Sequence, residues 1–207
     1  MAFLELPRRA MEETMFRYAG LGVLAALLTV PASAQIGNPA GLDADTKMSE
    51  PGVPAPHQTN NQDRLFARLA AAGGMAEVDL GKLAAGKSET GAVKDFANRM
   101  VTDHDAANDK LKQLAEAARM PLPEKPDAEH AAIKERLQSL SGEAFDIAYI
   151  KAEIVDHQKT SLLLQWEISL GEDAELQRFA AETLPGVLQH LESARNIHAD
   201  LTGAAIR

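Results

Sequence analysis

Four ionisable residues occupy positions where the helical pattern of the sequence calls for apolar side chains. These residues are Glu77, His104, His157 and His190. Each lies in a different stretch in which apolar residues recur at alternating spacings of three and four, the pattern of a buried helix face. Three imidazoles and a carboxylate suit one divalent transition metal, with Zn, Cu, Fe, Ni and Mn as candidates. The spacing therefore indicates a polar layer inside a helical protein and a candidate metal site.

Two arrangements would satisfy such a buried layer. In the first, one divalent metal is bound by the three imidazoles and Glu77. In the second, Glu77 accepts a hydrogen bond from a histidine, the other imidazoles bond to carbonyls or water, and the layer only fixes helix register. The sequence has no Glu-x-x-His motif, which di-metal carboxylate bundles carry on two helices. A ferritin-type ferroxidase is therefore disfavoured, and at most one metal is expected.

Long amphipathic helices must position these four residues. The pattern predicts a short connecting helix over residues 127–140, capped by Asp127, and four long helices over 62–86, 92–119, 143–170 and 172–201. Short turns join the long helices into two hairpins, so the predicted fold is all-α, a ferritin-like four-helix bundle over residues 62–203. Up-down-up-down and crossover topologies both remain open, and both place the four residues near mid-height.

Several neighbouring residues allow more than one interpretation. Asp103 and Asp156 directly precede His104 and His157, two of the histidines on the buried helix faces. Both aspartates are expected to be solvated. The alternative is that each holds a histidine of another helix in place. Glu153 is either a further ligand or the partner of a nearby base. His130 lies in the first turn of the connecting helix and is expected to be exposed. Pro185 predicts either a kink beside His190 or the start of a separate helix.

The N-terminus has the features of an export signal. Arginines precede a short apolar stretch, and Ala32-Ser33-Ala34 forms a small-residue cleavage site. Residues 1–34 are predicted to be a signal peptide, with Gln35 as the first mature residue and either Met1 or Met15 as the start. The apolar stretch is too short for the ~20 residues of a membrane span. Residues 35–61 are predicted to form a flexible tether, and the mature protein is expected in the periplasm or outside the cell.

Composition excludes several kinds of function. There is no cysteine, so thiolate metal sites and cysteine nucleophiles are impossible. The net charge of −9 argues against a nucleic-acid partner. Neither a phosphate-binding glycine loop nor a serine nucleophile elbow is present, and an enzyme is not the favoured interpretation. Protein partners and the oligomeric state are left open.

Four sequence blocks resemble a known family of exported bacterial proteins, domain of unknown function 4142. The blocks are "GGMAEVDLGKLAAGKS", "VKDFANRMVTDHDAANDKL", "FDIAYIKAEIVDHQKT" and "LQRFAAETLPGVLQHLESA", and the likeness covers about residues 62–201. The resemblance implies a ferritin-like fold in the cell envelope without an established activity. The Glu and Asp-His positions of the family match Glu77, Asp103-His104 and Asp156-His157. Its Leu-Pro…His block matches Leu184, Pro185 and His190. The resemblance adds little on function, and the Glu/His layer leaves two expectations: metal binding in metal handling or oxidative stress, or a non-catalytic structural, stress-protection or interaction role.

Overall fold

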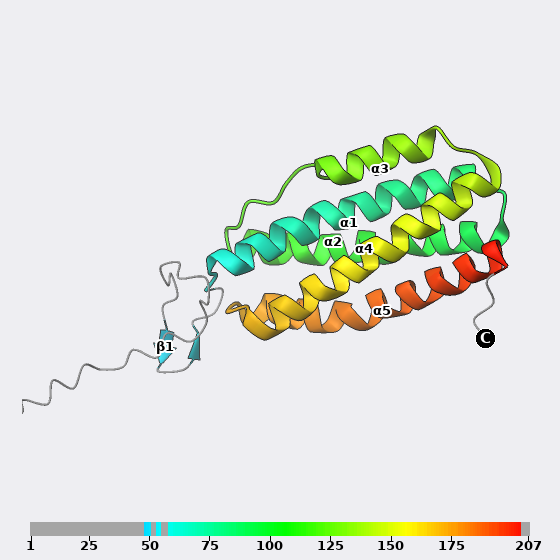
Figure 1. Cartoon of the computed structure of the whole chain (residues 1–207). Coiled ribbons are helices and arrows are strands. Elements are labelled where there is room, and N and C mark those ends of the chain that lie inside the picture. The colour runs from blue at the N-terminus through cyan, green and yellow to red at the C-terminus, as the bar shows by residue number, and fades with distance from the viewer. Residues whose placement is uncertain (1–47, 51–52, 55–57, 204–207) are drawn as a thin grey trace, which may run out of the picture. The chain divides into compact units, whose positions relative to one another are not determined.

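The structure, a computed structural model, describes residues 48–50, 53–54 and 58–203. The predicted signal peptide and most of the predicted tether lie outside the described residues. Within them the elements are β1 (Met48–Glu50), β2 (Val53–Pro54), α1 (Asn61–Lys87), α2 (Gly91–Ala117), α3 (Ala128–Gln138), α4 (Gly142–Leu170) and α5 (Ala174–Thr202) (Figure 1). The predicted all-α fold is confirmed, and the predicted helix bounds agree with the observed ones to within two residues.

The two strands form a short antiparallel hairpin inside the segment predicted as a tether. Strands of two or three residues are too short to produce a period in the sequence, so the pattern could not reveal them. Among the described helices, none is long and apolar enough to cross a membrane.

Side chains at the helix starts explain where the helices begin. Asn60 and Asp63 form a capping box at α1, in which Asp63 N donates to Asn60 Oδ1 at 2.8 Å and Asn60 N donates to Asp63 Oδ2 at 2.7 Å. Asp127 caps α3 as predicted, and Asp173 caps α5. Pro185 lies inside one continuous helix, α5, so the interpretation that it starts a separate helix is wrong.

Contacts between the turns settle the topology, which is a crossover bundle. Thr90, at the α1–α2 turn, donates through Oγ1 to Asp146 at the start of α4, at 2.6 Å. At the opposite end, Glu172 N in the α4–α5 turn donates to Asp63 Oδ1 at the start of α1, at 2.9 Å. Helix α2 therefore ends at one end of the bundle and α4 begins at the other. The connection, including α3, runs along the outside of the bundle between those ends (Figure 1).

The interior consists of two apolar clusters. One is centred on Phe66, Leu111, Leu164 and Phe179, and the other includes Met100, Phe96, Tyr149 and Ile150. Each long helix contributes residues to both clusters. Along each helix, the ionisable residue named above (Glu77, His104, His157 or His190) lies between the residues of the first cluster and those of the second. The three histidines and Glu77 are therefore a polar layer between two apolar halves of the core.

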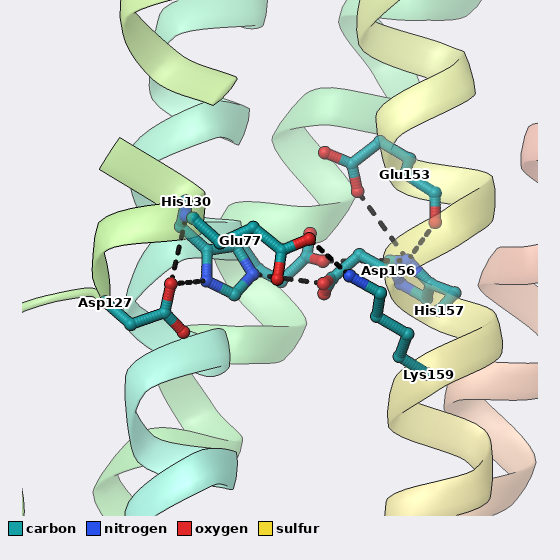
Figure 2. Close-up of polar contacts among 8 residues, drawn as sticks. Glu77, Asp127, His130, Glu153, Asp156, His157 and Lys159 are labelled. Carbon is teal, nitrogen blue, oxygen red and sulfur yellow. Dashed lines mark hydrogen bonds and ion pairs between the residues drawn. The ribbon is translucent and has the colours of Figure 1, made fainter. Parts of the chain in front are cut away.

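A partly buried ion pair is one of the contacts that attach helix α3 to the bundle. His130 Nε2 lies 3.0 Å from Asp156 Oδ1 on α4, and its Nδ1 lies 2.9 Å from Asp127 Oδ1 (Figure 2). The His130 side chain is only 12% exposed, so the prediction that it is solvent-exposed is wrong. The sequence pattern missed this because the contact is made across the crossover, to a residue on a different helix. The Asp156 hydrogen bond raises the pKa of His130 to about 9.

Substituting His130 with alanine is expected to destabilise the docking of α3 by about 1–2 kcal/mol. The variant would leave Asp156 partly buried without its cation, which costs free energy. Because the folded-state pKa is raised above the ordinary 6.5, the His130 contribution is fully present below pH 6.5 and is lost as the pH rises toward 9. Hydrogen exchange of α3 amides at pH 6 and pH 9 measures this. Equal protection of α3 in the variant and the parent protein at pH 6 would contradict the expectation.

Candidate metal centre

Three helices bring three imidazoles together in the polar layer. His104 comes from α2, His157 from α4 and His190 from α5. Their ring centroids are 5.6 Å apart for His104–His157, 5.6 Å for His104–His190 and 5.4 Å for His157–His190. All three residues are buried, and each offers a nitrogen that lies within 4.8 Å of those of the other two. The predicted convergence of the three histidines is therefore observed.

Each ring keeps one buried nitrogen without a hydrogen-bond partner among the described residues. These atoms are His104 Nε2, His157 Nε2 and His190 Nδ1. A buried nitrogen without a partner is costly, because it has lost its bonds to water and gained none. Three such atoms in one layer offer free lone pairs to a common ligand.

The outer partners fix which nitrogen of two of these rings carries the proton. His157 Nδ1 lies 2.9 Å from the carbonyl oxygen of Glu153 one turn earlier, and His190 Nε2 lies 2.8 Å from Asp103 Oδ2. Both partners can only accept, so these nitrogens carry the protons and donate. The opposite nitrogen of each ring is left with a free lone pair. This carboxylate or carbonyl contact behind a histidine is the usual outer shell of a metal-bound imidazole.

Asp103 has a role that the sequence raised only as an alternative. It bonds His190 on the neighbouring helix α5 and also accepts from Arg99 Nε at 3.2 Å. Burial acts to raise the pKa of Asp103, but its hydrogen bonds to His190 and Arg99 outweigh that and lower it. Asp103 and Asp156 each contact a histidine on another helix, His190 and His130; Asp103 is also 43% exposed, as expected for a solvated carboxylate, whereas Asp156 is only 14% exposed.

The three imidazoles are neutral at physiological pH. Burial lowers the pKa of His104 to about 3 and that of His157 to about 4, with the neighbouring histidines adding to the effect. Burial also lowers the pKa of His190, although Asp103 opposes it. Neutral imidazoles are the form that binds metals, so no proton has to be displaced from the free nitrogens.

Glu77 lies on the other side of His157. Its Oε1 is 3.7 Å from His157 Nδ1, the proton-bearing edge, and Glu153 Oε2 is 3.6 Å from the same atom (Figure 2). Glu77, Glu153 and His157 form a second group of possible ligands, and Glu77 does not share the group of His104 and His190. The structure therefore places three of the four predicted residues at one position and the fourth beside it.

Glu153 was only a secondary candidate in the sequence, yet it is as buried as His157. It is 1% exposed and makes no ion pair with Lys151 among the described contacts. Burial raises the pKa of Glu77 well above its usual value, and the neighbouring Glu153 adds to this. Burial likewise raises the pKa of Glu153 to about 7. Periodicity missed Glu153 because α4 buries a face wider than one stripe, and the one signal was its position one turn before His157.

Three imidazole nitrogens are the kind of ligands that a divalent transition metal takes. In a tetrahedral site with metal–nitrogen bonds of ~2.0–2.1 Å, the ligand nitrogens lie roughly 3.3 Å apart. The ligand nitrogens of the three rings lie within 4.8 Å of one another. Small rotations of the rings would bring them to that distance. Three protein nitrogens would leave a fourth position for water or another ligand, which is the arrangement of open rather than closed zinc sites.

The fold and the layer together define a ferritin-like four-helix bundle with a histidine layer at mid-height. The chain belongs to the family described as domain of unknown function (DUF4142), whose model matches residues 48–197. The resemblance found in the sequence is thereby confirmed, and the match extends into the segment predicted as a tether. No curated protein matches the chain.

Solved structures with similar folds share little sequence with this chain. A DUF305 fragment from Deinococcus radiodurans has a TM-score of 0.63 at 15% identity, over 70% of this chain and 99% of that one. A structure described as "putative secreted protein DUF305" from Streptomyces coelicolor has a TM-score of 0.60 at 12% identity, over 68% and 94%. A two-domain protein from Anabaena variabilis, with DJ-1/ThiJ/PfpI-like and ferritin-like domains, has a TM-score of 0.52 at 12% identity, over 72% and 40%. At these identities the likeness shows the fold alone.

Proposed function

We propose that this protein is an exported metal-binding bundle that holds one divalent transition metal through His104, His157 and His190. Two observations carry the proposal: each ring has a buried nitrogen without a hydrogen-bond partner among the described residues, and each ring offers a nitrogen within 4.8 Å of those of the other two. A layer that only fixed helix register would be expected to satisfy these atoms within the protein. Glu77, predicted as a fourth ligand, is assigned instead to the carboxylate pair beside His157.

Metal handling or protection against oxidative stress is the role that such a site supports in the cell envelope. Export is supported by the signal-like features of residues 1–34 and by the description of one structural neighbour as a secreted protein. The site itself supports binding, and its free fourth position would let a metal be taken up and passed on. Mass spectrometry of the protein from a periplasmic fraction tests export, with Gln35 expected as its first residue and an uncleaved N-terminus contradicting it.

Metal content tests the binding proposal. Protein expressed without a histidine tag and purified from periplasm without a nickel column is expected to carry about one equivalent of transition metal. A register-only layer predicts none, even after incubation with Zn²⁺ and removal of the excess. Elemental analysis measures the difference.

Asp103 is expected to act on the metal through His190. Replacing Asp103 with alanine removes the acceptor that fixes the His190 ring, and metal affinity is expected to fall roughly 10- to 100-fold. Asp103→Asn, which keeps an acceptor oxygen but no charge, should recover part of the loss. Competition with a chromogenic zinc chelator measures the affinity. Asp105→Ala is the matched control, since Asp105 is an exposed aspartate two residues away on the same helix; an equal loss in both variants would contradict the role of Asp103.

A further inference from the structure

Beside the three imidazoles lies a pair of buried carboxyl groups that the proposed function does not use. Glu77 comes from α1 and Glu153 from α4, and their side chains approach the same edge of the His157 ring (Figure 2). Both are at most 3% exposed. A ligand oxygen from each, together with a His157 nitrogen, lies within 4.8 Å of the others.

Within the described part of the chain, the basic group in contact with this pair is His157 Nδ1, which already bonds to the Glu153 carbonyl. Among the described residues, Glu77 Oε2 and both carboxylate oxygens of Glu153 are buried without a well-formed hydrogen bond, and the Tyr149 hydroxyl is the nearby donor that interacts with Glu153. The next histidine, His130, is paired with Asp127 and Asp156. Two adjacent carboxylates in a dry interior cost several kcal/mol each unless something positive lies between them.

Only two things can neutralise such a pair, a shared proton or a cation. A shared proton keeps one carboxyl neutral but still leaves acceptor oxygens without donors. A divalent cation would neutralise both carboxylates at once and take up the unpartnered oxygens as ligands. Glu77 Oε1 and Glu153 Oε2 both lie beside His157 Nδ1. The two carboxyl groups are therefore close enough to bind the same ion.

We propose that Glu77 and Glu153 form a second cation position, for a hard divalent cation such as Mn²⁺, next to the three-imidazole site. The two carboxylates are its protein ligands, and water completes the coordination. His157 stands between the two positions: its Nε2 faces the imidazole group, while its Nδ1–H keeps the bond to the Glu153 carbonyl. This inference goes beyond the proposed function and stands whether or not the imidazoles bind metal.

The two positions differ in the metals they prefer. Carboxylate and water oxygens suit Mg²⁺, Ca²⁺ and Mn²⁺, whereas imidazoles suit Zn²⁺ and Cu²⁺. The bundle would therefore sort two kinds of cation within one polar layer. The sequence led us to expect at most one metal, because it has no Glu-x-x-His motif. The proposed second position revises that expectation. Its second carboxylate comes from Glu153, four residues before His157.

The test is a titration of Mn²⁺, followed by electron paramagnetic resonance, into tag-free protein preloaded with one equivalent of Zn²⁺. The parent protein is expected to bind about one further equivalent of Mn²⁺, and Glu77→Gln/Glu153→Gln is expected to weaken that binding at least ~10-fold. Glu167→Gln is the matched control, because Glu167 is a fully buried glutamate outside this pair. His104→Ala/His190→Ala should lose Zn²⁺ and keep Mn²⁺, which separates the failure of this inference from the failure of the proposed function.

Three results would overturn the second position. These are no Mn²⁺ binding by the parent protein at millimolar concentration, unchanged binding by Glu77→Gln/Glu153→Gln, and equal weakening by Glu167→Gln. Each would mean that the pair holds a shared proton only. If the double variant does not fold, the parent protein still decides the question by NMR. Mn²⁺ must broaden the amide signals of residues 77 and 153 first, and broadening confined to exposed acidic residues overturns the proposal.

Discussion

Replacing His104 and His157 together with alanine is expected to abolish stoichiometric zinc binding. The parent protein should bind about one equivalent of Zn²⁺, and the variant should bind at least about a hundred-fold more weakly. This exceeds the loss expected for an outer contact such as Asp103, because two of three direct ligands are gone. Isothermal titration calorimetry, with chelator competition for tight binding, measures the affinity.

The matched control for this variant is His198→Ala. His198 lies two turns beyond His190 on α5 and does not belong to the histidine group. It should bind zinc like the parent protein. Removing two buried side chains also leaves cavities, so circular dichroism must show that the double variant keeps its helices. Undiminished zinc binding by a folded double variant would mean that the metal sits elsewhere.

The free energy of unfolding is expected to fall steeply as the pH rises above neutral, and replacing Glu167 with glutamine is expected to remove most of that fall. Glu167 is fully buried near the end of α4, and burial together with the nearby Asp63 raises its pKa to about 9. In the folded protein it is therefore a neutral acid that can donate to Asp63, a carboxylate already accepting from the backbone of Asn60 and Glu172. Glutamine has the same shape and can donate in the same way without an ionisable proton.

The direction of the pH effect follows from the two pKa values of Glu167. The folded-state pKa, about 9, is above the ordinary 4.5. The stabilising contribution is therefore complete below pH 4.5 and is lost progressively as the pH rises to 9. Between pH 7 and pH 9 the parent protein should lose about 2–3 kcal/mol more than Glu167→Gln. Urea unfolding at the two pH values measures this, and parallel losses in both proteins would show that Glu167 does not carry the effect.

Local sequence rules were sufficient for the helices and for the histidine layer. Apolar periodicity, the Asp127 cap and the glycine after Leu170 placed every helix end to within two residues. The same periodicity placed three histidines on buried faces of three helices. Rise per residue then put them at one height, because the helices are straight enough for that arithmetic to hold.

Contacts between helices distant in sequence could not be predicted in the same way. Nothing in the order of residues showed that α3 would lie against α4, and so His130 was misplaced at the surface while its partner is Asp156. Leu69 shows the limit of a single stripe: its spacing fits the pattern, yet it is 46% exposed, because α1 turns Ala67 and Ala71 toward the core instead. The sequence marked Glu153 only through its position one turn before His157, and it gave no sign that Glu167 is buried, since buried and exposed carboxyl groups look alike in a sequence.

Binding of one metal ion by three imidazoles, from α2, α4 and α5, is what we propose for the polar layer. Zinc K-edge X-ray absorption of tag-free protein loaded with one equivalent of Zn²⁺ tests it directly. We expect about three imidazole nitrogens at ~2.0–2.1 Å with one further light ligand, and loss of the imidazole signal in His104→Ala/His157→Ala. A zinc environment made of oxygen ligands alone, or an imidazole signal that the double variant retains, would contradict it.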